Sequence, residues 1–244
     1  MELALDKVPL RIEILFLATV LGTLALLVLA VQAAAQRTGR DDVGLWTVRA
    51  VAGAVIWLAA TGLVANTGVL LDFSLPPKIF FLLLVSVALT CSVAFSGVGS
   101  VLIGGIGPVG LVAFQFFRLP VEIFLHGMYE AGQVPVQMTY AGLNFDIFSG
   151  LTAPAMAWLI WRGKMWRIGL WGWNIFGLVL LANIVTIAIL SMPTEFRIFM
   201  NEPANTFVAH IPYVWLPTVL VQTALLGHLL LFRWLWAHRG GEQV

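Results

Sequence analysis

Four ionisable side chains follow one another at four-residue steps in a segment that is otherwise apolar. The segment FQFFRLPVEIFLHGMYE contains Arg118, Glu122, His126 and Glu130. In a helix this spacing places the four side chains along one slowly rotating face about 18 Å long. Carboxyl and imidazole groups exchange protons and a guanidinium binds anions. The face is therefore a candidate for proton coupling, for acid–base chemistry or for binding a polar solute.

Three more polar residues are expected near the end of this face. Asn144 and Asp146 follow it in EAGQVPVQMTYAGLNFDIFSG, and His210 precedes the last apolar segment. Two imidazoles and a carboxylate are an adequate ligand set for zinc or iron. His126 and His210 show no HxxxH or HExxH spacing, so we expect no metal. The candidate substrate-binding or proton-coupling residues are Arg118, Glu122, His126, Glu130, Asn144, Asp146 and His210.

The composition is that of a protein embedded in a lipid bilayer. Of the 244 residues, 60% are hydrophobic and 10% are charged, and the mean hydropathy is +0.96. Soluble domains carry about 25% charged residues. The shortfall excludes a disordered chain, a nucleic-acid binder and most soluble folds. The single cysteine, Cys91, excludes an internal disulfide framework and a cysteine-built metal site.

Seven apolar runs are bounded by charges, proline or glycine, and a span needs roughly 20 such residues. The sequence therefore predicts an all-α integral membrane protein, a seven-transmembrane-helix bundle forming a single polytopic domain over residues 1–244. The break between the third and fourth runs is placed in the glycine cluster that ends at Gly107, with Pro108 opening the next helix. The predicted spans are residues 13–35, 49–71, 78–98, 107–128, 147–161, 168–191 and 213–236.

The distribution of cations predicts the orientation of this bundle. With seven spans, one side carries Arg37, Arg40, Arg49, Arg162, Lys164, Arg167, Arg233 and Arg239, and the other carries Lys7, Arg11, Lys78 and Arg197. Short loops rich in lysine and arginine stay cytoplasmic. Most tryptophans, Trp166 among them, fall near the first side, and all tyrosines near the second. We therefore expect the N-terminus outside and the C-terminus cytoplasmic, in a cell membrane of the bacterial inner-membrane type.

Two longer loops on the outer side carry their own patterns. In the loop 130–146, apolar and polar residues alternate after Pro135, which is typical of a short β-hairpin. A loop that folds back into the bundle and a solvated connector are the alternatives. The charged residues of the loop 192–212 suggest a helix that lies on the membrane surface.

The ionised residues within the fourth span have both a structural and a functional interpretation. Charges at membrane depth cost at least about 2.5–3.5 kcal/mol each, so they face other helices or water. Arg118 and Glu122 either pair with each other or with a neighbouring helix to lock the bundle, or they line an outward-opening cavity. Pro120 removes a backbone donor beside them and predicts an irregular helix at this point.

Three functions fit these features. The first is a small-solute or proton-coupled carrier, in which Arg118 binds an anionic group or holds Glu122 ionised. The second is a membrane-embedded enzyme acting on a lipid or prenyl substrate, with Glu122 and His126 as acid and base. The third is a non-catalytic accessory or sensor subunit. No Walker, GxSxG or GxGxxG motif occurs in a suitable context, so no cofactor is expected. The expected partners are the bilayer and a small polar or anionic solute or a lipid.

Overall fold

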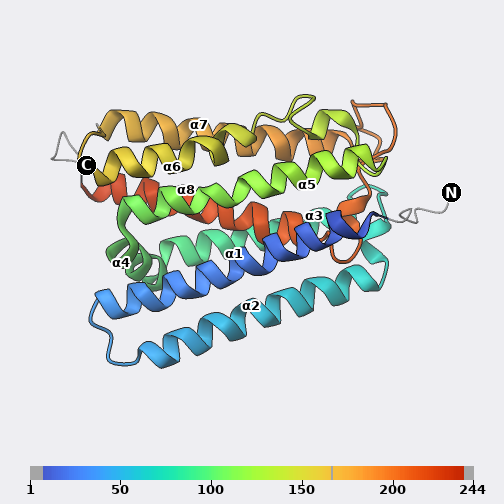
Figure 1. The fold of residues 1–244 in the computed structure, drawn as a ribbon. Coiled ribbons are helices and arrows are strands. Elements are labelled where there is room, and N and C mark those ends of the chain that lie inside the picture. The colour runs from blue at the N-terminus through green and yellow to red at the C-terminus, as the bar shows by residue number, and fades with distance from the viewer. Residues whose placement is uncertain (1–7, 166, 239–244) are drawn as a thin grey trace.

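Every regular element of the described chain is helical in the computed structural model, which describes residues 8–165 and 167–238 (Figure 1). The α-helices are α1 (Leu10–Arg37), α2 (Val43–Asn66), α3 (Lys78–Phe95), α4 (Gly97–Phe114), α5 (Arg118–Glu130), α6 (Ile147–Trp161), α7 (Arg167–Leu190) and α8 (Val221–Ala237). The shorter elements are the 3-10 turns η1 (Val69–Leu71), η2 (Gln115–Phe117), η3 (Val136–Met138) and η4 (Phe207–Ala209) and the π-helix η5 (Leu216–Leu220).

In the described part of the chain, six helical segments are long and apolar enough to cross a membrane. They are Leu10–Arg37, Val43–Asn66, Lys78–Phe95, Gly97–Glu130, Arg167–Leu190 and Leu216–Ala237. The helix α6 is apolar but shorter. The all-helical fold expected from the sequence is therefore confirmed, and the six long helices indicate a multi-pass membrane protein. The largest shift from an expected boundary is at the start of the fourth span, which was predicted at residue 107, whereas α4 begins at Gly97.

The long helices run side by side along one axis, and the beginning of α1 and the end of α8 lie at opposite ends of the bundle (Figure 1). The helix α8 lies at the centre, packed against α3, α4 and α7. Two thirds of the positions in its apolar stretch are buried, against a third or fewer in the other five long segments. The surrounding helices therefore expose most of their apolar surface.

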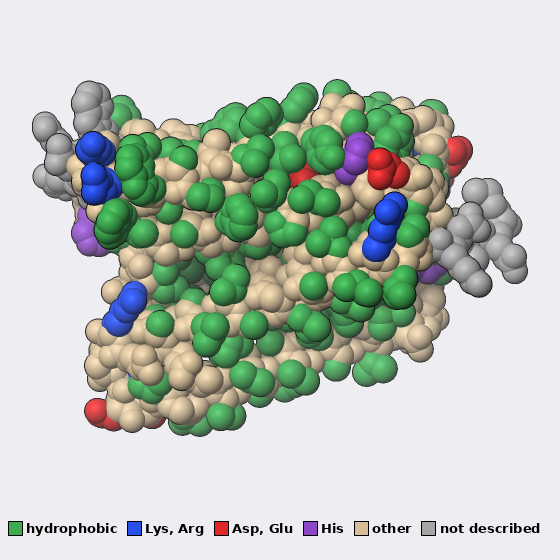
Figure 2. Space-filling model, in the orientation of Figure 1, with side chains coloured by type: hydrophobic (Ala, Val, Ile, Leu, Met, Phe, Trp, Pro, Cys, Tyr) green, Lys and Arg blue, Asp and Glu red, His purple; other side chains and the backbone are tan. Residues whose placement is uncertain are grey.

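The outer surface is hydrophobic between its two ends. Leu21, Ile56 and Leu84 are each more than half exposed. Figure 2 shows hydrophobic side chains spread over the middle of one face, while the lysine and arginine side chains on that face lie near its two ends. An apolar surface this large is stable in contact with lipid tails and not with water.

The helical structure is interrupted at two points near the glycine cluster, where the sequence predicted a single break. The helix α3 ends at Phe95, and the next residue, Ser96, caps α4, because its hydroxyl accepts a hydrogen bond from the backbone N–H of Val98 (3.1 Å). Within α4, Gly107 has φ 66° and ψ −179°, and Pro108 opens the second limb. Figure 1 shows the first limb end-on, at the end of the bundle where α8 ends. The second limb continues through η2 into α5.

At the end of the bundle where α8 ends, arginine side chains hydrogen-bond to backbone carbonyls near several helix ends. Arg37 Nη1 donates to the carbonyl of Gly105 (2.9 Å) beside the Gly107 kink. Arg233 donates to the carbonyl of Ala94 at the end of α3, and Arg167 donates to the carbonyl of Leu235 near the end of α8. Cationic donors satisfy the last carbonyls of a helix and interact favourably with its dipole.

Two predictions about the loops at the other end are wrong. The described residues contain no strand, and the expected β-hairpin over residues 130–146 is instead a series of turns around η3. The loop 192–212 contains turns and the three-residue η4 but no surface α-helix. Lys7, Trp166 and Arg239, which entered the orientation argument, lie outside the described residues.

Candidate functional site

Arg118 is the hub of a buried polar cluster. Proline at position 120 removes the donor that would reach the carbonyl of Phe116, and the backbone narrows to the 3-10 turn η2 just before Arg118. The Arg118 side chain is 2% exposed. It forms a two-pronged ion pair with Asp146, the residue that precedes α6, in which Nε donates to Oδ2 (2.8 Å) and Nη2 donates to Oδ1.

The remaining N–H groups of the Arg118 guanidinium donate hydrogen bonds to residues of α7 and α8. Nη1 and Nη2 both donate to the carbonyl of Gly177 (3.4 and 3.3 Å), and Nη1 also donates to Nε2 of His228 (2.8 Å). An arginine side chain has five N–H donors. All five therefore have an acceptor within the protein, and Arg118 joins α5, α6, α7 and α8.

The ring of His228 is fixed as one neutral tautomer by its two partners. Since a guanidinium only donates, Nε2 must accept from Arg118. The proton is then on Nδ1, which donates to Oδ1 of Asn174 (2.8 Å). The amide of Asn174 donates back to the carbonyl of His228 (3.1 Å). Gly177 is needed here, because a Cβ at that position would lie 2.6 Å from Cε1 of His228.

Glu122 lies one turn beyond Arg118 and is 1% exposed. Its Oε2 accepts a hydrogen bond from the amide of Asn144 (2.7 Å), and the same amide donates to the carbonyl of Met138 (3.1 Å). The Asn144 Oδ1 accepts from the backbone N–H of Asp146 (3.0 Å). Asn144 therefore positions both carboxylates. No cation of the described residues forms an ion pair with Glu122, since Arg118 pairs with Asp146.

His126 and Glu130, the other two members of the four-residue series, lie apart from this cluster. His126 stacks on Tyr140, with ring centroids 4.4 Å apart, and its Nε2 is 3.8 Å from the largely exposed carboxylate of Glu130. Each four-residue step rotates the side-chain direction by about 40° around a helix, so the directions of Arg118 and Glu130 differ by roughly 120°. The first two side chains point into the bundle, and the last two lie toward its surface.

No metal centre is formed by the predicted ligands. His210 lies directly after η4 in the loop that leads to η5. Among residues 8–165 and 167–238, no group of three or more histidine, cysteine, aspartate or glutamate side chains is placed to hold a metal ion.

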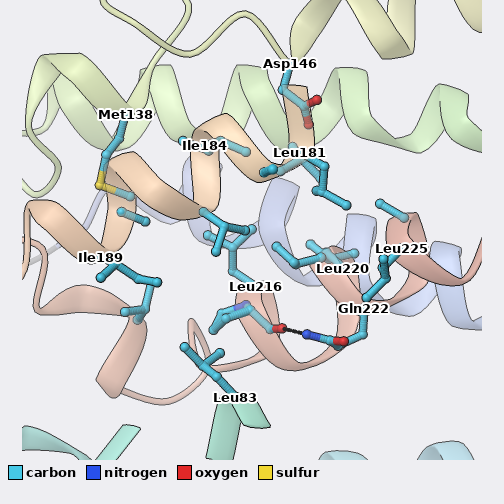
Figure 3. A pocket seen from close by; sticks show the side chains of 18 of the residues that line it. Leu83, Met138, Asp146, Leu181, Ile184, Ile189, Leu216, Leu220, Gln222 and Leu225 are labelled. Atoms are coloured by element: carbon cyan, nitrogen blue, oxygen red, sulfur yellow. Dashed lines mark hydrogen bonds between the residues drawn. The ribbon is translucent and has the colours of Figure 1, made fainter. Parts of the chain in front are cut away.

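A cavity of about 520 Å³ lies beside the cluster, between α3, α5, α7 and the segment formed by η5 and α8. Arg118, Glu122 and Asp146 contribute to its wall, and almost all other lining residues are hydrocarbon. In Figure 3, Asp146 lies on one side of the cavity, with Leu83 and Gln222 on the opposite side.

The π-helix η5 shapes the wall that faces Asp146. Pro217 lies within it, and the carbonyl of Pro217 accepts from the amide of Gln222 (3.0 Å), as drawn in Figure 3. The Gln222 Oε1 accepts from the hydroxyl of Thr90 in α3 (3.0 Å). Side-chain bonds therefore compensate for the irregular backbone at this point.

The cavity contains one further polar residue at its far end. Asn205 is fully buried, and its amide donates to the carbonyl of Ala188 near the end of α7 (2.8 Å). Its Oδ1 is buried and has no hydrogen-bond partner among the described residues. Eleven residues separate Ala188 from Gly177, the α7 carbonyl that binds Arg118. At a rise of 1.5 Å per residue this is about 16 Å along the helix.

The structure brings four of the seven predicted site residues together and separates the other three. Arg118, Glu122, Asn144 and Asp146 form the cluster, whereas His126, Glu130 and His210 are not among the residues that line the cavity. His228, Asn174 and Asn205 are not among the residues that the sequence singled out. Their depth along the chain could have indicated His228 and Asn174. Arg118 lies about 16 Å beyond the Gly107 kink, Asn174 about 10 Å beyond the start of α7, and His228 about 14 Å before the end of α8, all measured from the arginine-rich end of the bundle.

A comparison of the chain with protein-family models, with characterised proteins and with solved structures finds no match.

Proposed function

We propose that this protein binds the hydrocarbon chain of a membrane amphiphile in the cavity beside Glu122, and thereby carries or presents a lipid-like molecule. The observation that supports the proposal is the cavity itself, a space of about 520 Å³ inside an apolar bundle with polar groups confined to few points of its wall. Its volume lies within the range of small-molecule sites, about 300–1,000 Å³, and such sites are mostly apolar with a few placed polar groups.

The chemistry of the wall favours a hydrocarbon chain over a small polar solute. Only five of the described lining residues are polar: Arg118, Glu122, Asp146, Asn205 and Gln222. A polar solute would lose its hydration in such a space without gaining an equal number of hydrogen bonds. An alkyl or prenyl chain would instead exchange lipid contacts for similar protein contacts.

The side of the cavity between α3 and α7 supports access from the bilayer. On α3, the lining residues Leu84 and Val87 are 67% and 39% exposed, and on α7 the lining residue Ala182 is also exposed. Residues that belong both to the cavity wall and to the apolar outer surface mark an opening toward lipid. An amphiphile dissolved in the membrane would reach the cavity by this route.

The alternatives are less well supported by the geometry. A carrier that binds an anion at Arg118 would have to break bonds to Asp146, His228 or Gly177, which occupy all its donors. An enzyme that uses Glu122 and His126 as an acid–base pair would need both at the reacting atoms, and His126 is not among the residues that line the cavity.

We further propose that α6 crosses the membrane with the six longer helices, giving seven crossings with the N-terminus outside. The ends of α1, α6 and α8 and the beginnings of α2 and α7 lie together at one end of the bundle (Figure 1). These termini and their loops carry most of the cations. The positive-inside rule supports assigning this end to the cytoplasm, and the location that we propose is a cell membrane.

The binding proposal is tested by placing a large side chain in the opening between α3 and α7. Protein in phosphatidylcholine nanodiscs is labelled with a headless alkane that carries a photoreactive diazirine, and the labelled peptides are identified by mass spectrometry. We expect saturable labelling of α3 and α7, which Ala182→Trp lowers by about tenfold or more, equivalent to about 1.4 kcal/mol. Ala155→Trp is the matched control, since Ala155 is exposed on α6 and does not line the cavity. Labelling that does not saturate, or that is the same in Ala182→Trp, contradicts the proposal.

A further inference from the structure

We infer that the head of the bound amphiphile carries a hydroxyl group, lies at the end of the cavity where α7 ends, and donates a hydrogen bond to the side-chain oxygen of Asn205. This head assignment rests on the proposed function and adds to it the chemical class of the head and the direction of the chain. It depends on a buried amide, whose acceptor and donor atoms do not change with protonation.

Asn205 belongs to the loop after α7 and closes the end of that helix. Its backbone N–H donates to the carbonyl of Ser191 (2.8 Å), and its side-chain amide donates to the carbonyl of Ala188 (2.8 Å). The last carbonyls of a helix have no partner within the helix. Closing the helix therefore accounts for the two donors of Asn205, but not for its side-chain oxygen.

This oxygen is an acceptor without a donor. Since the carbonyl of Ala188 only accepts, the amide nitrogen of Asn205 must face it, and Oδ1 takes the other position. The side chain is fully buried, and Oδ1 has no hydrogen-bond partner among the described residues. Of the described residues that contain such an atom, Asn205 alone lines the cavity. A buried acceptor without a donor costs free energy, which a hydroxyl group of the ligand would recover.

The surroundings of Asn205 favour a head without charge. The lining residues near the end of α7 are apolar, among them Ile189 and Met192. The acidic lining residues belong instead to the cluster around Arg118. An ammonium head would therefore be buried here without a carboxylate. A phosphate or carboxylate head would lack a donor, because the amide of Asn205 is already bonded to Ala188. A charge buried without a partner costs far more free energy than a hydroxyl.

The depth of Asn205 is that of the heads of membrane amphiphiles. Ala188, which accepts from its amide, is two residues from the end of α7, or about 3 Å of helix. Glu122 is eight residues from the end of α5, or about 12 Å. An amphiphile in a leaflet has its head at the membrane surface and its chain in the hydrocarbon core. It can enter between α3 and α7 without inverting if its head lies beside Asn205, whereas a head beside Glu122 would have to move into the core.

The chain then extends away from Asn205, toward α5 and the first turns of α8. Figure 3 shows Ile189 at one end of the cavity and Gln222 and Leu225 at the other. The amide and the carbonyl of Gln222 are both bonded within the protein, and a hydrocarbon chain end needs no hydrogen bond. A long-chain alcohol, a prenol or a monoacylglycerol has the shape and the chemistry that this arrangement fits.

The head assignment is tested by competition against the headless diazirine alkane in phosphatidylcholine nanodiscs. The competitors share one chain length and differ in the head: hexadecanol, its methyl ether, hexadecylamine and palmitate. The ether accepts hydrogen bonds but cannot donate one to Asn205. We expect hexadecanol to displace the probe at a mole fraction about fivefold lower than the ether, equivalent to about 1 kcal/mol, the net value of one hydrogen bond. The amine and palmitate should bind no better than the ether. A preference for either charged head over hexadecanol would overturn the inference.

The substitution Asn205→Leu removes the acceptor and replaces it with a side chain of similar size. We expect hexadecanol and its ether to compete equally in this variant, because neither finds an acceptor. Asn201→Leu is the matched control, since it makes the same change in the same loop. Asn201 is exposed, its amide donates to Gln137 (2.7 Å), and it does not line the cavity, so the fivefold preference should remain. An unchanged preference in Asn205→Leu would contradict the assignment.

A second measurement decides the matter if the Asn205→Leu protein does not fold. In the unsubstituted protein, a hexadecanol with its diazirine beside the hydroxyl should label Ile189 or Met192, and one with its diazirine at the chain end should label Leu178 or Leu225. The reversed pattern would place the head at the wrong end. If the alcohol and the ether compete equally in the unsubstituted protein, chain binding stands and the head assignment fails. If no amphiphile displaces the probe, the proposed function itself fails.

Discussion

At the scale of single residues, the ion pair of Arg118 with Asp146 is a structural element that also forms part of the cavity wall. Both side chains are buried, so each charge has lost its hydration and depends on the other. Removing one partner leaves the second unpaired at membrane depth, which typically costs about 3–5 kcal/mol. The pair of Arg197 with Glu202 offers a contrast, since Glu202 is 65% exposed and such pairs contribute about 0–1 kcal/mol.

We therefore expect Asp146→Asn to lower the stability of the folded protein by about 3–5 kcal/mol, and the same change at the exposed Glu202, Glu202→Gln, by no more than about 1 kcal/mol. The measurement is thermal unfolding in mild detergent, followed by tryptophan fluorescence. The double variant Arg118→Met with Asp146→Leu should recover part of the loss, because it leaves no unpaired charge. Equal effects of Asp146→Asn and Glu202→Gln would show that the ion pair of Arg118 with Asp146 is not essential to the bundle.

The residue types of the cluster were predictable from the sequence, but their pairing was not. Arg118 and Glu122 are conspicuous because charges are rare within apolar helices, and Asn144 and Asp146 because they follow closely. Which of the two carboxylates pairs with Arg118 depends on where the chain re-enters the bundle after α5. The bond from His228 to Arg118 joins residues 110 positions apart and depends on how α8 packs.

At the scale of secondary-structure elements, Gly107 divides α4 into two limbs by a conformation that only glycine adopts readily. Its φ of 66° with ψ of −179° lies in a region that is sterically closed to side chains. The kink turns the chain from the end of the bundle into the limb that leads to Arg118, so it determines where the cluster begins.

Replacing Gly107 by alanine should destabilise the protein by about 1–3 kcal/mol, the usual strain of such a conformation. Gly53→Ala serves as the control, since Gly53 lies within α2 with open space around it, and alanine there should be neutral or stabilise the helix slightly. Thermal unfolding of both variants in one detergent makes the comparison. A Gly107→Ala protein as stable as Gly53→Ala would mean that the kink is not strained.

The helices were predictable because their apolar runs are long, while the hairpin prediction failed because alternation alone does not supply a partner strand. Gln137, in the middle of the alternating stretch, is buried. Its amide donates to the hydroxyl of Ser191 (2.9 Å), and its Oε1 accepts from Asn201 (2.7 Å). Side-chain bonds to the loop after α7 therefore replace the backbone ladder that a hairpin would have needed.

At the scale of the whole molecule, the cavity lies in the half of the bundle opposite the arginine-rich end. It extends from Arg118 and Gln222 to Ile79, Met192 and Leu216, at the end where α3 and η5 begin. The orientation of the bundle therefore decides which leaflet the opening between α3 and α7 faces. With the proposed orientation it faces the outer leaflet.

The orientation and the crossing by α6 are tested together by the labelling of single cysteines. In a Cys91→Ser background, Ser74→Cys and Glu130→Cys should react with a membrane-impermeant maleimide in intact cells. Asp41→Cys and Lys164→Cys should react only after the cells are opened. All four positions are exposed, so a difference in labelling reports the side of the membrane and not burial. Glu130 and Lys164 flank α6, and labelling of both from the same side would exclude this helix as a crossing. The reverse pattern at all four positions would invert the bundle and assign the opening to the cytoplasmic leaflet.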